Sequence, residues 1–178
     1  MKAILVQPTA EWAVIDGEAA TVASIYTGYV MILAAIPAVC GAIGLALLGF
    51  SIGTVIRVLV ARYLGALIGT YVLALVIDAL APTFGGQKDQ VRAFKVAAYS
   101  ATASWVVGVV GLVPALGILG LLGLYSLYLL YTGLPILMKT PADRAMGYTA
   151  VVIVAAIVVF VLIGVVTASL TGVSGRWR

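Results

Sequence analysis

The feature that most constrains this chain is a series of five long and almost uncharged apolar runs. They lie at about residues 23–48, 58–80, 94–112, 115–138 and 145–170. Each run can cross a hydrocarbon core of about 30 Å as a helix that rises about 1.5 Å per residue. The runs show no alternation of polar and apolar residues, which favours helices over barrel strands. We therefore predict an all-α integral membrane protein built as a bundle of five transmembrane helices.

The composition supports the same class. Of the 178 residues, 64% are hydrophobic and only 9% are charged. A soluble domain is usually about 45–50% apolar and about 25% charged. A chain of this length cannot bury so much apolar surface inside one core. Lipid must therefore surround most of it.

The segments outside the apolar runs are short. The N-terminal segment, residues 1–22, contains the stretch "QPTAEWAVIDGEAA". We predict an interfacial helix here, capped by Thr9 and with Trp12 at the membrane surface. A tail that docks onto a partner is the alternative. A short C-terminal tail, residues 171–178, is expected after the last span.

The fourth break, within "GLPILMKTPADRAMGY", has the residues of a helix start. Thr140, Pro141 and Asp143 are predicted to be the N-cap, N1 and N3 positions of the last helix. With five spans, this break shares a side with the N-terminal segment and the second break. That side carries six basic residues, Lys2, Lys88, Arg92, Lys95, Lys139 and Arg144. The other side carries four, Arg57, Arg62, Arg176 and Arg178. The positive-inside rule then predicts a cytoplasmic N-terminus and a C-terminus on the opposite side.

The sequence lacks the residues that most catalytic and metal sites need. There is no histidine, and Cys40 is the single cysteine. The usual zinc, haem and iron–sulfur ligand sets and any internal disulfide are therefore excluded. Asp78, Asp89 and Asp143 belong to different helix boundaries and do not form a paired acid–base site. We expect no catalytic residues, no metal, no cofactor and no enzymatic activity.

The basic residues point to membranes rather than to nucleic acid, because they lie at the ends of the apolar runs and form no cluster. Four of them are candidate contacts for a lipid head group or another anion: Arg57, Arg62, Lys139 and Arg144. The first two lie at the start of the second run. Their alternative role is simple snorkelling to the membrane surface. Lys139 and Arg144 lie in the fourth break, which is also a possible docking surface.

Several polar residues form candidate faces inside the membrane. Lys95, Tyr99 and Thr102 follow a spacing of i, i+4 and i+7, which places them on one helical face. Ser100 and Ser104 form a second pair in the same run. Further candidates are Asp78 near the end of the second run and the stripe Tyr125, Tyr128 and Tyr131 in the fourth. Such residues either pack between helices or line a path for a substrate or proton. The tyrosines are alternatively a stacking surface for a lipid or quinone. Gly65 and Gly69 fit a small-residue contact between helices.

The stretch from Phe94 to about Phe160 resembles the prokaryotic branch of the Yip (Ypt-interacting protein) family. The resemblance is carried by "AYS" near Tyr99, the Pro-x-x-Gly turn after Pro114, and "LMKTP" closing on "GY" at Tyr148. The N-terminal "PTAEW" is also similar. The resemblance implies a five-span protein with a cytoplasmic N-terminus, here in a bacterial inner membrane. Eukaryotic relatives bind Rab-type GTPases and act in vesicle traffic. This chain lacks their Asp-Leu-Tyr-Gly-Pro motif, so the resemblance does not carry GTPase binding to it.

Two functions remain open from the sequence. The first is a non-enzymatic Yip-like protein that acts through membrane lipids, an integral membrane partner or its own oligomers. It would organise the membrane or serve as an accessory subunit of a membrane complex. The alternative is a small transporter or channel for a lipid, ion or small solute. In that case the Lys95 face and the tyrosine stripe would line the path.

Overall fold

The structure, a computed structural model, describes residues 2–171, which are mostly helical and contain no strand. The helical elements are α1 (Lys2–Val6), α2 (Pro8–Gly17), α3 (Val22–Ile25), η1 (Tyr26–Val30), α4 (Met31–Leu47), α5 (Ile52–Leu80), η2 (Ala81–Phe84), α6 (Gln90–Ser100), α7 (Thr102–Val107), η3 (Gly108–Leu112), η4 (Pro114–Leu124), α8 (Tyr125–Leu137) and α9 (Ala142–Thr171). The tail predicted for residues 171–178, with Arg176 and Arg178, lies outside the described residues except for position 171.

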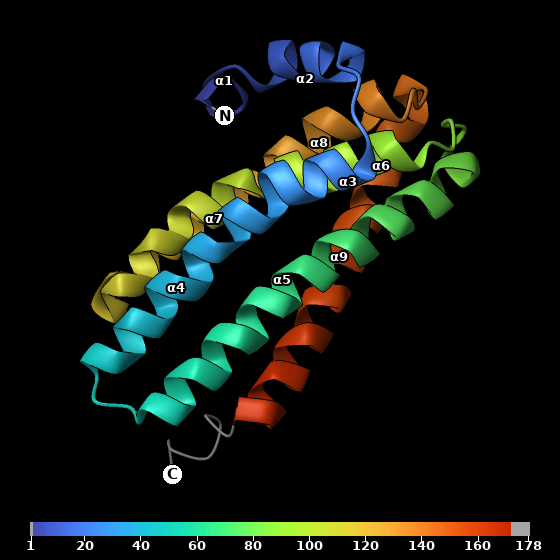
Figure 1. The fold of residues 1–178 in the computed structure, drawn as a ribbon. Coiled ribbons are helices and arrows are strands. Elements are labelled where there is room, and N and C mark those ends of the chain that lie inside the picture. Colours follow the sequence, from blue (N-terminus) through green and yellow to red (C-terminus); the bar gives the residue numbers. More distant parts are fainter. Residues whose placement is uncertain (1, 172–178) are drawn as a thin grey trace.

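Five stretches of these helices are long and apolar enough to cross a membrane: Val22–Leu47, Ile52–Phe84, Gln90–Leu112, Ile118–Leu137 and Ala142–Ser169. The predicted all-α fold with five membrane helices is confirmed. The spans run along one another, while α1 and α2 lie across one end of the bundle (Figure 1). The described chain therefore starts at one end of the bundle and finishes at the other.

The N-terminal helix forms as predicted, but its cap and its tryptophan differ from the prediction. Helix α2 begins at Pro8, which suits the first helical position because proline lacks an N–H. The N-cap is Gln7, whose side chain makes no capping bond, so Thr9 does not cap the helix. Trp12 is fully buried rather than at a surface. Its ring packs against α8 at Gly133, where the missing side chain leaves room for it.

The second span starts six residues earlier than the run predicted from residue 58. Helix α4 ends at Leu47, and the turn that follows it contains Gly49, whose φ of +80° favours glycine. Helix α5 begins directly afterwards, because the Ser51 side chain accepts a bond from the backbone N–H of Thr54 at 3.4 Å. Arg57 and Arg62 consequently lie inside α5 rather than at its start.

The break between α8 and α9 is a tight helix end rather than a capped helix start. Lys139 has a φ of +52°, and the N–H of Thr140 bonds to the carbonyl of Pro135 at 3.3 Å, as in a Schellman motif. The Thr140 hydroxyl is buried and has no partner among the described residues. The prediction that Thr140 caps the last helix was therefore wrong. Helix α9 begins at Ala142.

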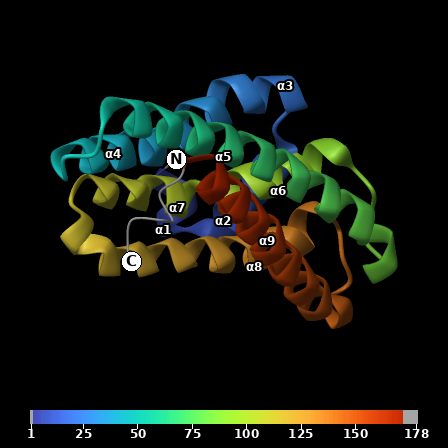
Figure 2. The same cartoon turned by 90° about the horizontal axis from the view of Figure 1, so that it is seen from below.

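The glycine pair of α5 forms a close helix contact, as predicted. Helix α9 lies beside α5 in both views (Figures 1 and 2). A methyl group at Gly65 would come within 2.7 Å of Ile163, and one at Gly69 within 2.9 Å of Phe160. Small residues at these positions let the two helices approach, which is how membrane helices gain packing contacts.

We predict that Gly65→Leu and Gly69→Leu each destabilise the bundle, because a larger side chain must push α9 away from α5. Overpacking of this kind costs about 1–3 kcal/mol. The measurement is the thermal midpoint of the detergent-solubilised protein, followed by circular dichroism. Gly53→Leu is the control on the same helix, since nothing lies within 4 Å of Gly53. Equal midpoints for all three variants would contradict this packing.

Candidate functional site

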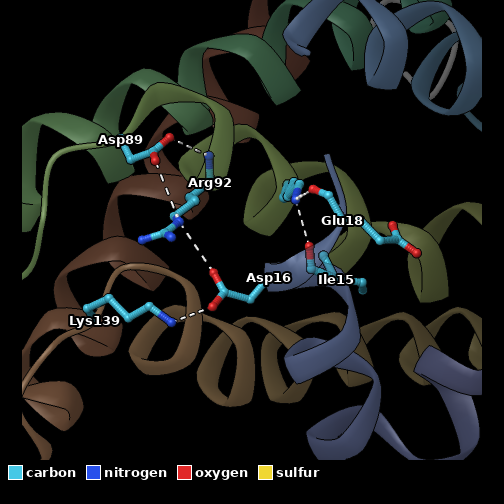
Figure 3. A network of polar contacts seen from close by, with 7 residues as sticks. Ile15, Asp16, Glu18, Asp89, Arg92 and Lys139 are labelled. Carbon is cyan, nitrogen blue, oxygen red and sulfur yellow. Dashed lines mark hydrogen bonds and ion pairs between the residues drawn. The ribbon is translucent and has the colours of Figure 1, made fainter. Parts of the chain in front are cut away.

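A buried lysine fastens α2 to the bundle. The Lys95 side chain of α6 is only 3% exposed. Its ammonium group donates hydrogen bonds to the carbonyl oxygens of Ile15 and Glu18, both at 2.6 Å (Figure 3). These carbonyls stand at the C-terminal end of α2, where the helix dipole favours a cation. The Ile15 carbonyl also accepts from the N–H of Glu18 at 3.3 Å, whereas Lys95 is the donor found for the Glu18 carbonyl among the described residues. Lys95 therefore holds α2 against α6.

Charged residues of three elements meet beside this lysine. Asp16 of α2 lies between Arg92 of α6, at 3.3 Å, and Lys139, with which it forms a short ion pair (Figure 3). Arg92 also lies 3.5 Å from Asp89, whose carboxylate caps α6. Each partly exposed pair contributes little alone, about 0–1 kcal/mol. Together they fix the position of α2 over the ends of α6 and α8.

An aromatic group completes the contact between the N-terminal helices and the spans. The indole N–H of Trp12 donates to the Thr132 hydroxyl at 3.1 Å. The ring of Tyr99 contacts both Trp12 and Tyr29 edge to face. The Tyr29 and Thr102 hydroxyls share a hydrogen bond of 2.6 Å. The face formed by Lys95, Tyr99 and Thr102 thus exists, and it packs against other helices.

The tyrosine stripe of α8 divides between two environments. The Tyr125 hydroxyl donates to the carbonyl of Leu5 at 3.2 Å and supports α1. Tyr128 and Tyr131 are 47% and 46% exposed on the outside of the bundle. Residues three apart turn away from one another by about 60° on a helix, so the stripe cannot keep one orientation. The stripe therefore does not line one interior surface.

Asp78 stands apart from the other candidates near the end of α5. It is buried, and one of its carboxylate oxygens has no hydrogen-bond partner among the described residues. Tyr148 of α9 is fully buried beside it. Its hydroxyl donates to the carbonyl of Ile77, the residue before Asp78, at 2.5 Å. Apart from the family resemblance, no pattern in the sequence marked Tyr148 as a buried polar residue.

Two adjoining cavities lie on the other side of α6. The larger measures about 850 Å³ and the smaller about 460 Å³, and Pro37, Arg62 and Phe160 line both. The larger cavity is also lined by Ser100, Ser104, Trp105 and Ser126 but not by the Lys95 face or the tyrosine stripe. The serine pair noted in the sequence, rather than the first polar face, therefore borders the open space.

The four basic residues proposed to contact anions do not form one site. Lys139 lies at the end of the bundle covered by α2, and Arg144 lies in the first turn of α9, near the loop at Gly85. Lys139 pairs with Asp16, while Arg144 is exposed and 3.9 Å from Asp143. Arg57 and Arg62 lie in the N-terminal half of α5, away from the end that α2 covers. The Arg57 guanidinium donates to the carbonyl of Gly53 at 3.2 Å.

Five apolar spans with polar groups directed between the helices define a multi-pass integral membrane protein. The Yip1 domain family matches residues 2–163, and the chain belongs to that family. The family resemblance seen in the sequence is thereby confirmed. No curated protein and no solved structure matches the chain significantly.

We predict that Lys95→Met releases α2. The substitution keeps a long apolar side chain but removes both ammonium hydrogen bonds and leaves the Glu18 carbonyl without its donor, at a cost of about 1–3 kcal/mol. Hydrogen exchange of residues 8–17 in the purified protein measures the release. Exchange there should accelerate about tenfold or more.

Lys88→Met is the matched control, because Lys88 is exposed in the loop before α6. Unchanged protection in Lys95→Met would mean that Trp12 and the ion pairs hold α2 without the lysine.

Proposed function

We propose that the protein is a non-enzymatic accessory protein of the bacterial inner membrane. It acts through membrane lipids, an integral membrane partner or its own oligomers, in membrane organisation or within a larger complex. The observation that carries this proposal is the internal use of the polar side chains. The polar groups of Lys95, Thr102 and Tyr125 donate hydrogen bonds to backbone carbonyls of the bundle. These contacts support a structural role for the three side chains.

The distribution of acidic residues supports a protein without catalytic activity. Asp16 and Asp89 are paired with Arg92 at the covered end of the bundle. Asp78 is buried near the end of α5, and Asp143 is exposed at the start of α9. A general acid and base must approach one substrate together. The four aspartates are not arranged as a general acid and a general base facing one substrate.

The end covered by α2 is proposed to face the cytoplasm. Arg92 and Lys139 pair with Asp16 at this end, Arg144 follows in the first turn of α9, and Lys88 lies in the loop before α6 (Figure 3). An excess of basic residues in short loops favours retention in the cytoplasm. The exposed pair Asp143 and Arg144 is the part of this end that is best placed to meet a partner.

We expect a stoichiometric membrane protein or lipid to co-purify when the protein is extracted with its surrounding bilayer in polymer nanodiscs. Mass spectrometry of the purified particles identifies it. Where a protein partner is found, Asp143→Asn with Arg144→Gln should lower its retention several-fold, because rim charges guide association. Arg57→Gln, at the other end of the bundle, is the control. A monomer that is repeatedly recovered without a protein partner, in particles whose lipid composition equals that of the whole membrane, would contradict the proposal.

A small transporter is the second candidate, favoured by the cavity of about 850 Å³ that Arg62 borders. Halide influx into liposomes, followed with an encapsulated halide-quenched dye, separates the two functions for anions. The accessory role predicts influx equal to that of empty liposomes. Influx that requires the protein and is abolished by Arg62→Gln would favour transport.

A further inference from the structure

We infer that Arg62 and the two cavities beside it form a binding site for an anionic phospholipid of the bilayer. The phosphate would contact the guanidinium group, and an acyl chain would occupy the larger cavity. This inference rests on the proposed function, in which the protein acts through lipids, and specifies the lipid class and the place where it binds.

Arg62 lies within the depth of the membrane rather than at its edge. The span Ile52–Phe84 has its midpoint at residue 68. Arg62 is six residues from it, about 9 Å along the helix axis, inside the half-thickness of about 15 Å of the hydrocarbon core. Arg57 is eleven residues away, about 16 Å, at the boundary. A charge at the depth of Arg62 is costly unless it has a partner.

The four other basic side chains within the spans have the partner that Arg62 lacks. Arg92 pairs with Asp16 and Asp89, and Arg144 lies 3.9 Å from Asp143. Lys95 donates to two carbonyls, and Arg57 donates to one. Within residues 2–171, the Arg62 guanidinium makes no hydrogen bond and no ion pair, and its side chain is exposed at the cavities. An external anion would supply the missing partner and offset the desolvation of the charge.

The Arg62 guanidinium group packs against a glycine of α4. A methyl group at Gly41 would lie 2.5 Å from one terminal nitrogen of Arg62. Because Gly41 has no side chain, the guanidinium can lie against the α4 backbone. In this position it stands where the two cavities adjoin, at Pro37 and Phe160.

The hydroxyl groups around the larger cavity are already occupied. Ser100 donates to the carbonyl of Val96, and Thr70 to that of Ala66. Ser104 donates to the carbonyl of Gly123 and also bonds to Ser126. Among the described lining residues, Arg62 is the one that carries a charge, and none of its donors is used within the protein. The site therefore offers one cation in a largely apolar space.

The cavity suits an occupant that arrives from the membrane. Its volume of about 850 Å³ lies in the range of small-molecule sites, about 300–1,000 Å³. Leu124, Ile157 and Val161 belong to its lining and are largely exposed on the outside of the bundle. The cavity thus reaches the lipid-facing surface beside α9. One positive charge beside an apolar, laterally open space is complementary to a phospholipid with a net negative head group.

Native mass spectrometry of the full chain in a non-ionic detergent tests the site. The probes are dioleoylphosphatidylglycerol, dioleoylphosphatidylcholine with the same chains, and inorganic phosphate. We expect one phosphatidylglycerol to be held about tenfold more tightly than phosphatidylcholine, with no retention of free phosphate. Arg62→Gln should lower the phosphatidylglycerol affinity about tenfold or more, as expected for loss of a charged contact.

Three further variants separate the charge, its position and the cavity. Arg57→Gln removes a charge from the same helix and should leave the affinity unchanged. Gly41→Ala keeps the Arg62 charge but displaces it and should weaken phosphatidylglycerol several-fold. Gly120→Leu adds a side chain at the cavity lining, where nothing lies within 4 Å, and should weaken both phospholipids. Circular dichroism of each variant establishes that it is folded.

Equal affinities for the two phospholipids, or equal losses in Arg57→Gln and Arg62→Gln, would overturn the inference. Retention of a second copy of the chain at this surface in place of lipid would overturn it too. In either case a partner that co-purifies through another surface would leave the proposed function standing. Conversely, selective phosphatidylglycerol binding together with protein-dependent halide influx would support the site and contradict the accessory role.

Discussion

The attachment of α2 to the bundle is the interaction on which the arrangement of one whole end depends. Lys95 carries a charge into a buried place, and the carbonyls of Ile15 and Glu18 compensate it there. In lipid, unpaired polar groups are costly, so a membrane protein places them where they bond to one another. Here one lysine meets two such demands, its own charge and the Glu18 carbonyl at the C-terminal end of α2.

The two ends of the bundle differ in how fully their polar groups are used. At the end covered by α2, side chains from α2, α6 and α8 form hydrogen bonds and ion pairs with one another. In the opposite half, cavities of about 850 and 460 Å³ lie beside an arginine that lacks a partner among the described residues. The first arrangement holds helices together, whereas the second is the place proposed for the lipid. The contacts that stabilise the bundle and the proposed lipid site are thus separated along its axis.

The sequence predicts the parts of this structure that depend on local patterns. Apolar runs of sufficient length located the five spans, and the spacing of Gly65 and Gly69 located a helix contact. The spacing of Lys95, Tyr99 and Thr102 placed three polar groups on one face. In each case the period of the helix carries the information, and no distant residue is needed.

The predictions that failed depended on a distant contact or on a backbone conformation that the residue pattern does not reveal. Trp12 looked like a surface anchor because its recess, at Gly133, lies far along the chain. Thr140 looked like a cap because nothing in the sequence revealed that Lys139 would adopt a left-handed conformation. Arg62 was placed at the edge of a span because the apolar run begins near residue 58. Helix α5 in fact begins at Ile52, directly after the turn at Gly49. The lack of a partner for Arg62 became visible only once α4 and the cavities were in place.

The contact between Trp12 and Thr132 has a consequence for the order in which the protein is made. The two residues are 120 positions apart, so Trp12 leaves the ribosome well before its partner exists. At about 5–20 residues per second, the interval is about 6–24 s. Throughout that time the apolar side of α2 lacks the surface that later covers it. The seating of α2 is therefore a late event, and it reports that the fourth span has been inserted beside the third.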